Sequence, residues 1–216
     1  MNLLNEKIII QKFSYIKQLD LLRAVAVLGV IFYHYTDGYF TGGWLGVDVF
    51  FVLSGFLISN TIISSLTKKN FKFKSFYIRR IRRILPSLLS TILFTVPFSF
   101  QLLAPKELIE YLRSTASSLF FISNFYLLDL DFYNTSSAKL MPMIHTWSLS
   151  IEEQFYIVFP VFMFLIYKNE KINKFLIIFI FFIVSIFIAA SLSSEVAFYL
   201  PQFRICLLYT SDAADD

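Results

Sequence analysis

Long apolar runs separated by short polar clusters dominate the sequence. Three runs carry no charged residue over a helix-spanning length: 49–67, 84–104 and 175–192. Two further runs reach that length only by including charged side chains: 19–35 with Asp20 and Arg23, and 150–167 with Glu152 and Glu153. A helix needs ~20 residues to cross ~30 Å of hydrocarbon. The pattern therefore predicts five membrane-spanning helices, two of which carry ionisable side chains into the bilayer.

One more stretch, 114–128, is apolar but too short to span, so we expect it to form an outer-leaflet or re-entrant segment. Composition agrees with a membrane protein. Of the 216 residues, 57% are hydrophobic and only 16% are charged, with a mean hydropathy of +0.67. These values exclude an ordinary soluble domain. We predict an all-α fold, a polytopic transmembrane helical bundle with about five helices.

The last residues of the chain, 206–216, differ in character from the Phe- and Ile-rich sequence before them. They resemble the translation of an adapter used in sequencing libraries. We therefore interpret 1–205 as the N-terminal part of one membrane domain and 206–216 as a non-native tail. The only cysteine, Cys206, falls in that tail and indicates nothing about redox compartment.

Basic residues predict the orientation of the helices, because Lys and Arg accumulate on the cytoplasmic side of a membrane. Three segments are rich in them: 7–17, 68–83 and 168–174. The segments between, 37–46 and 104–143, hold few. Five alternating spans place all three basic segments inside. We expect a multi-pass protein of the cell (inner) membrane with a cytoplasmic N-terminus.

This orientation brings polar residues of two spans to one depth. Arg23 lies near the cytoplasmic face, and His34, eleven residues later, lies ~16 Å further out on the same helix face. The fourth span starts outside, which carries Glu152 and Glu153 to a similar depth. We predict that the histidine and the carboxylates converge in one polar cavity.

The chemistry of that cavity follows from its residue types. Histidine accepts and releases a proton near neutral pH, and a neighbouring carboxylate would orient its ring and support the imidazolium. His34 and a glutamate could thus deprotonate a hydroxyl. Alternatively, His34 is a buried polar residue satisfied by a backbone carbonyl. Adjacent helical residues point about 100° apart, so one glutamate faces His34 squarely; we favour Glu152 over Glu153.

A second candidate site is the arginine cluster. It contains two Arg-x-x-Arg pairs: Arg79, Arg80, Arg82 and Arg83. Four arginines at helical spacing suit bidentate phosphate binding. A topology signal with lipid-headgroup contact explains the same cluster. With two histidines and no credible native cysteine we expect no metal site, and because the positive charge sits at the membrane surface we expect no nucleic acid partner.

Together these residues resemble the acyltransferase 3 family of integral membrane acyltransferases. Four ordered motifs carry the resemblance: Arg23 with His34, GVDVFFVLSGFLI at 46–58, the Arg-x-x-Arg cluster, and TWSLSIEEQFY at 146–156. It covers about residues 15–204. The resemblance implies a fold of about ten membrane helices, of which this chain supplies about five. It also implies acyl-CoA, acetyl-CoA above all, as a cytoplasmic donor, with no tightly bound cofactor.

The acceptors implied by the resemblance are cell-surface glycans such as O-antigen or peptidoglycan. His34 would be the general base or transient acyl acceptor, and Glu152 or Glu153 would orient it. The remaining expected site residues hold the site or bind substrate: Arg23, Asp48, His145, Trp147 and Ser148. Two other classes stay open, a proton-coupled transporter or flippase that uses these groups as a relay, and a non-catalytic membrane scaffold.

Overall fold

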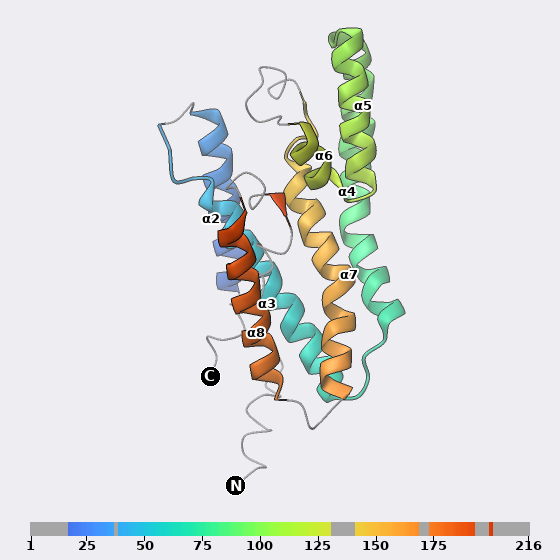
Figure 1. The fold of residues 1–216 in the computed structure, drawn as a ribbon. Coiled ribbons are helices and arrows are strands. Elements are labelled where there is room, and N and C mark those ends of the chain that lie inside the picture. Colours follow the sequence, from blue (N-terminus) through green and yellow to red (C-terminus); the bar gives the residue numbers. More distant parts are fainter. Residues whose placement is uncertain (1–16, 37–38, 131–140, 169–172, 193–198, 201–216) are drawn as a thin grey trace. The chain divides into compact units, whose positions relative to one another are not determined.

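The computed structural model describes residues 17–36, 39–130, 141–168, 173–192 and 199–200 (Figure 1). Seven α-helices lie in this part of the chain, and it contains no strand: α2 (Lys17–Tyr35), α3 (Leu45–Thr67), α4 (Phe73–Leu102), α5 (Pro105–Leu119), α6 (Ser123–Leu130), α7 (Thr146–Lys168) and α8 (Lys174–Ser191). The fold is all-α, as the sequence predicts. The chain divides into two compact units, residues 1–70 with 207–216 and residues 71–206.

The first unit is a helix pair, α2 against α3. Just before α3, the Gly43 N–H donates a hydrogen bond to the Phe40 backbone oxygen. In the first turn of α3, the Gly46 N–H donates one to the Gly43 backbone oxygen. Buried residues lie mainly on α3, including Phe51, Ile58 and Ile62. Much of α2 is apolar and exposed, which suits a helix surface in contact with lipid.

The second unit is built on the long helix α4, which has 30 residues. Pro105 occupies the first turn of α5, where a missing N–H costs no hydrogen bond, and α5 packs beside α4 (Figure 1). The Thr95 hydroxyl on α4 meets the Tyr111 hydroxyl on α5 at 2.7 Å. A core of Leu88, Tyr111 and Met143 fills this contact.

Helix α6 follows α5 after a tight turn and packs against both α5 and α7. Phe121 sits in this turn at φ 54°, a left-handed backbone conformation uncommon for a residue with a side chain. The predicted apolar segment 114–128 is therefore not continuous. It comprises the end of α5, a turn, and most of α6, and neither helical part is long enough to span a membrane.

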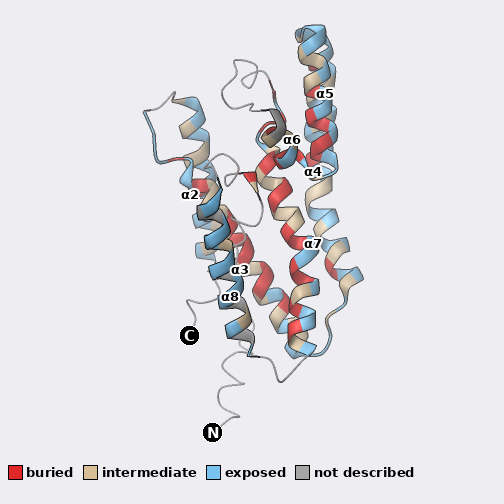
Figure 2. Cartoon of the chain, viewed as in Figure 1, coloured by how far each residue is buried: buried red, intermediate tan, exposed pale blue. Residues whose placement is uncertain are grey.

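Three helices of the described residues are long and apolar enough to cross a membrane: α3, α4 and α7. They match three of the five predicted spans. Helices α2 and α8 occupy the positions predicted for the other two. Exposed residues run along α8 and along the outer faces of α4 and α7, and many of them are large and apolar, as lipid contact requires (Figure 2). The chain has the structure of an α-helical membrane protein.

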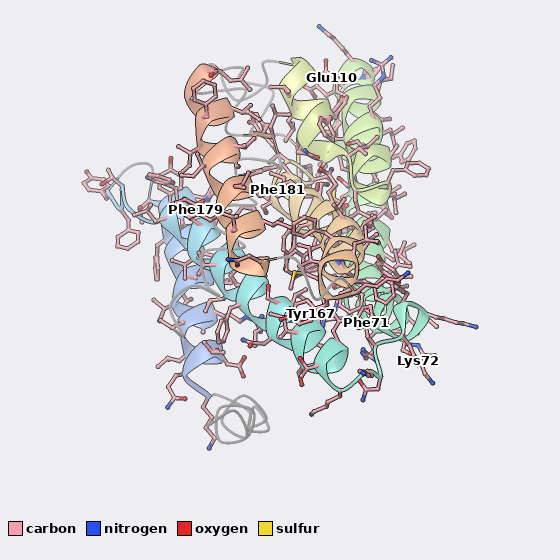
Figure 3. The ribbon with its side chains drawn as sticks, turned by 60° about the horizontal axis from the view of Figure 1, so that its bottom comes forward. Phe71, Lys72, Glu110, Tyr167, Phe179 and Phe181 are labelled. Carbon is pink, nitrogen blue, oxygen red and sulfur yellow. The ribbon has the colours of Figure 1, made fainter. Side chains whose placement is uncertain are left out.

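One helix boundary differs from its prediction. The sequence suggested a basic connection up to residue 83 followed by a span at 84–104, whereas α4 already begins at Phe73. Arginine and lysine are good helix formers, so the basic cluster forms the first turns of α4. Figure 3 shows Phe71 and Lys72 at this end, where the Phe71 ring meets the Phe73 ring edge-on at 5.0 Å. The predicted tail at 206–216 lies outside the described residues.

Candidate functional site

Small residues set the distance between α2 and α3. A Cβ atom added to Gly46 would lie 2.3 Å from the backbone oxygen of Ala26, and one added to Gly43 would lie 2.2 Å from the backbone oxygen of Gly29. Real Cβ contacts essentially never fall below 3.0 Å. The two backbones therefore touch at two successive points, an arrangement common where membrane helices cross. This contact fixes how α2 presents its polar side chains to α3.

The Arg23 side chain on α2 contacts Phe50 on α3. Its guanidinium carbon lies 6.0 Å from the centre of the Phe50 ring, within cation–π range. Its Nη1 lies 3.7 Å from Oδ1 of Asp20 on the same helix, and its Nε is buried without a hydrogen-bond partner. Arg23 is thus held at the helix pair by one ring and one carboxylate.

His34 lies in the last turn of α2 and is exposed. Its Nδ1 is 2.8 Å from the backbone oxygen of Val30, and its ring meets the Tyr33 ring edge-on. Because a carbonyl oxygen can only accept, a neutral ring in this contact carries its proton on Nδ1. Nε2 is then the basic nitrogen, which is the tautomer that a general base needs. Asp48, half-buried in the first turn of α3, lies in the same unit.

In the second unit, bulky side chains join α4 to α7. The Tyr77 hydroxyl donates a hydrogen bond of 2.9 Å to the backbone oxygen of Ile157, and the Phe73 ring packs edge-on against Phe164 at 5.4 Å. The start of α4 thus lies against the second half of α7. This pairing determines which residue further along α4 meets the glutamates of α7.

That residue is Arg80. Its guanidinium carbon lies 5.6 Å from the centre of the Tyr156 ring and 5.8 Å from that of Phe76. The Tyr156 hydroxyl donates a hydrogen bond to Oε1 of Glu152, one helical turn earlier. Glu153 follows Glu152 directly on α7. Two buried atoms here, Nε of Arg80 and Oε1 of Glu153, have no hydrogen-bond partner.

The four clustered arginines do not share one environment. Arg79, Arg82 and Arg83 are exposed, whereas Arg80 is half-buried. At about 100° per residue, Arg80 lies only about 60° from Arg83, so its burial and its contacts with Phe76 and Tyr156 are what distinguish it from the exposed three. The cluster therefore has an outward set of three cations and one cation turned toward α7.

The opposite face of α7 holds a polar network with α5 and α6. Its hydroxyl contacts run from Ser118 to Thr146 at 2.6 Å, from Thr146 to Ser123 at 3.2 Å, and between Ser123 and Ser150 at 2.7 Å. Gln154 continues the network by donating through Nε2 to the Phe121 backbone oxygen at 2.7 Å and to Oδ1 of Asn124 at 2.8 Å. The residues that α7 contributes are spaced four apart, so they form one stripe.

The other predicted residues of the 146–156 motif lie around this network. Trp147 is buried, 5% exposed, with its ring edge-on to Tyr199 at 5.8 Å. The Asn124 side-chain amide donates a hydrogen bond of 3.1 Å to the backbone oxygen of Tyr199, so both Asn124 and Trp147 contact this residue. His145 is exposed, and the Ser148 hydroxyl donates a hydrogen bond of 3.3 Å to the His145 backbone oxygen. The substrate-binding roles expected for Trp147, Ser148 and His145 stay predictions.

The structure thus brings Arg80 against Tyr156, which binds Glu152, inside the second unit, while Arg23, His34 and Asp48 belong to the first. The predicted meeting of His34 with the glutamates stays a prediction. Sequence reasoning missed Tyr156 and the stripe of Thr146, Ser150 and Gln154. The signal in the sequence is the four-residue spacing, from Thr146 to Ser150 to Gln154 and from Glu152 to Tyr156. In the described part of the chain, no three His, Cys, Asp or Glu side chains gather as metal ligands would.

Known proteins similar to this chain identify its family. The acyltransferase 3 family model, described as an acyltransferase domain, matches residues 16–210. The chain is 41% identical over 177 residues to "Putative O-acetyltransferase SACOL0978" of Staphylococcus aureus strain COL, covering 82% of this chain and 29% of that protein. It is 36% identical over 176 residues to "O-acetyltransferase OatA" of Staphylococcus aureus strain NCTC 8325 / PS 47, covering 80% of this chain and 29% of that protein.

The chain therefore spans less than a third of the length of these curated relatives. No solved structure matches it. The family match nevertheless covers nearly the whole chain and includes every motif that the sequence singled out. The chain belongs to the acyltransferase 3 family.

Proposed function

We propose that this chain is the N-terminal part of a membrane-embedded O-acyltransferase that moves an acyl group, acetyl in the first instance, from acyl-CoA to a hydroxyl of a cell-surface glycan. The observation that carries the proposal is the family match over residues 16–210. Relatives named as O-acetyltransferases support transfer of acetyl to oxygen. Helices α3, α4 and α7, which are long and apolar enough to span, support action within a membrane.

In this proposal His34 is the general base. Its Nε2 takes the proton of the acceptor hydroxyl, the acceptor oxygen attacks the thioester carbonyl, and the C–S bond breaks to release the coenzyme thiol with a proton. The contact from Nδ1 to the Val30 oxygen supports this role, because it favours the tautomer with a basic Nε2. The expectation from the sequence that Glu152 or Glu153 supports the imidazolium, and that Arg23 and Asp48 hold the site, is part of this proposal.

The donor would bind at the cytoplasmic end of α4. Arg79, Arg82 and Arg83 are exposed there on one side of the helix, and guanidinium groups bind phosphate oxygens in a bidentate manner. Coenzyme A presents several phosphate groups that such a set would hold. The basic segments predict this end to be cytoplasmic, with the N-terminus on the same side and the protein in the cell (inner) membrane.

The test is transfer of labelled acetyl from acetyl-CoA, in membranes that contain the complete protein of which this chain is a part. We expect label in the glycan fraction with the wild type and none with His34→Ala at unchanged membrane level. Tyr35→Ala is the matched control, since Tyr35 is the next residue and is 85% exposed. Transfer that survives His34→Ala would remove His34 from the mechanism.

The same experiment separates an enzyme from a transporter. A proton-coupled transporter or flippase would move solute across the membrane with no label joined to glycan. Absence of transfer by the wild type, with solute movement that depends on His34, would replace the proposed function with transport.

A further inference from the structure

Arg80 differs from its arginine neighbours in where its side chain goes. Arg79, Arg82 and Arg83 are exposed on one side of α4, and Arg80 is half-buried on the side that faces α7. Sequence spacing alone treats the four as equivalent phosphate ligands. The structure gives one of them different neighbours.

Those neighbours are aromatic and acidic. The Arg80 guanidinium carbon lies 5.6 Å from the Tyr156 ring centre and 5.8 Å from the Phe76 ring centre, and both rings are buried. Nε of Arg80 is itself buried and has no hydrogen-bond partner. A guanidinium held between rings, with one N–H turned inward, presents less of its donor fork to an outside phosphate than an exposed arginine does.

The acidic neighbours come from α7. Glu152 accepts a hydrogen bond from Tyr156, whose ring lies against Arg80, and Glu153 follows directly on the same helix. Two adjacent carboxylates in a helix that crosses a membrane repel each other and are costly without a nearby cation. Within the second unit's described residues, Arg80 is the cation that packs on the Tyr156 ring, and Tyr156 in turn binds Glu152.

We infer that Arg80 is a positioning residue, the internal counter-charge that holds Glu152, Glu153 and Tyr156 in place between α4 and α7, and that it is not a ligand of the donor's phosphates. This inference rests on the proposed function. It deepens that function by dividing the arginine cluster: the outward three bind the donor, and the inward one arranges the acidic pair.

Two donors distinguish these roles. Acetyl-CoA carries the nucleotide phosphates, and the acetyl thioester of pantetheine does not. For Arg80→Gln in the complete protein we expect kcat to fall at least about tenfold with both donors, with KM changed by less than about threefold. For Arg83→Gln, three residues on and exposed, we expect KM for acetyl-CoA to rise while the kinetics with the short donor stay the same. A loss in Arg80→Gln that disappears with the short donor would overturn the inference.

Conservative variants separate charge from packing. Arg80→Lys keeps the cation and Arg80→Met keeps apolar bulk. A counter-charge role predicts that Lys retains most of the kcat that Met loses, since the carboxylates respond to charge. Equal losses in both variants would show that shape alone matters at this position, and would also overturn the inference.

A stability measurement covers the case in which Arg80→Gln folds poorly. If the arginine neutralises the acidic pair, removing one carboxylate as well restores part of the lost melting temperature. We therefore expect the Arg80→Gln/Glu153→Gln double variant to melt above Arg80→Gln. Additive losses would contradict the inference. Failure of the wild type to transfer acetyl from either donor would instead remove the proposed function, while the double-variant melting result would still test the charge pairing.

Discussion

Replacing Gly46 by alanine should force α2 and α3 apart. The added methyl carbon would lie 2.3 Å from the Ala26 backbone oxygen, 2.9 Å from Cγ2 of Val30 and 3.1 Å from the Ala26 backbone carbon. Ordinary contact begins at 3.4 Å. A side-chain atom such as Cγ2 can rotate away, but a backbone oxygen inside a helix cannot. The helices must therefore separate locally by about 1 Å.

The size of the effect follows from this displacement. Forcing one extra methyl into a well-packed contact costs about 1–3 kcal/mol. Alanine recovers part of that cost, up to about 1 kcal/mol, because it favours a helical backbone more than glycine does. We expect a net loss of about 1–2 kcal/mol in the free energy of unfolding. Activity should fall further, since α2 carries Arg23 and His34, and a misplacement of about 1 Å can cost about a hundredfold in rate.

Gly42→Ala and Gly29→Ala are the matched controls. A Cβ atom at Gly42 would meet nothing within 4 Å, and one at Gly29 would meet its nearest atom at an ordinary 3.7 Å. We expect Gly42→Ala to unfold as the wild type does and Gly29→Ala, inside α2, to gain up to about 1 kcal/mol from helix propensity. Both should transfer acetyl as the wild type does, and thermal unfolding in detergent and label transfer measure these outcomes. If Gly46→Ala matched Gly42→Ala in both assays, the close crossing of α2 and α3 would not be what positions His34.

Two further predictions concern α7. Tyr156→Phe keeps the ring beside Arg80 and removes the hydroxyl that donates to Glu152. A hydrogen bond to a charged group contributes ~1.5–3 kcal/mol, so kcat should fall by about ten- to a hundredfold. An unchanged kcat in steady-state kinetics would contradict the role of this contact. Gln154→Leu roughly keeps the side-chain volume and removes two donated hydrogen bonds, to the Phe121 backbone oxygen and to Asn124. Thermal unfolding in detergent should show a loss of about 1–3 kcal/mol in the free energy of unfolding. An unaltered melting temperature would mean that the network does not hold α7.

The helices could be predicted because membrane insertion leaves a strong pattern. Apolar length alone located α3 and α7 within a few residues at most ends. The prediction failed where charge and helix propensity conflict: the sequence 73–83 is too basic to read as a span, yet it continues α4. The left-handed turn at Phe121, inside the apolar segment 114–128, could not be predicted, because no glycine or proline marks that position.

Residue types singled out candidate site residues but did not indicate which of them contact one another. Glu152, Glu153 and the arginines stood out because charges inside a bilayer need an explanation. Which arginine meets the glutamates depends on the rotation of α4, and that is fixed by Phe73 and Tyr77 packing on α7. These contacts join residues about eighty positions apart, so no local pattern reveals them.

The two faces of α7 explain why one short motif holds so many polar residues. Thr146, Ser150 and Gln154 bind α5 and α6 through a stripe of hydrogen bonds, and this fixes the rotation of α7 about its axis. Once that rotation is fixed, Glu152 and Tyr156 are directed to the side where α4 supplies a cation. A polar stripe satisfied by neutral hydroxyl and amide groups can be buried at little cost, whereas carboxylates cannot. The neutral face therefore holds the helix, and the charged face carries the carboxylates on which the proposed function depends.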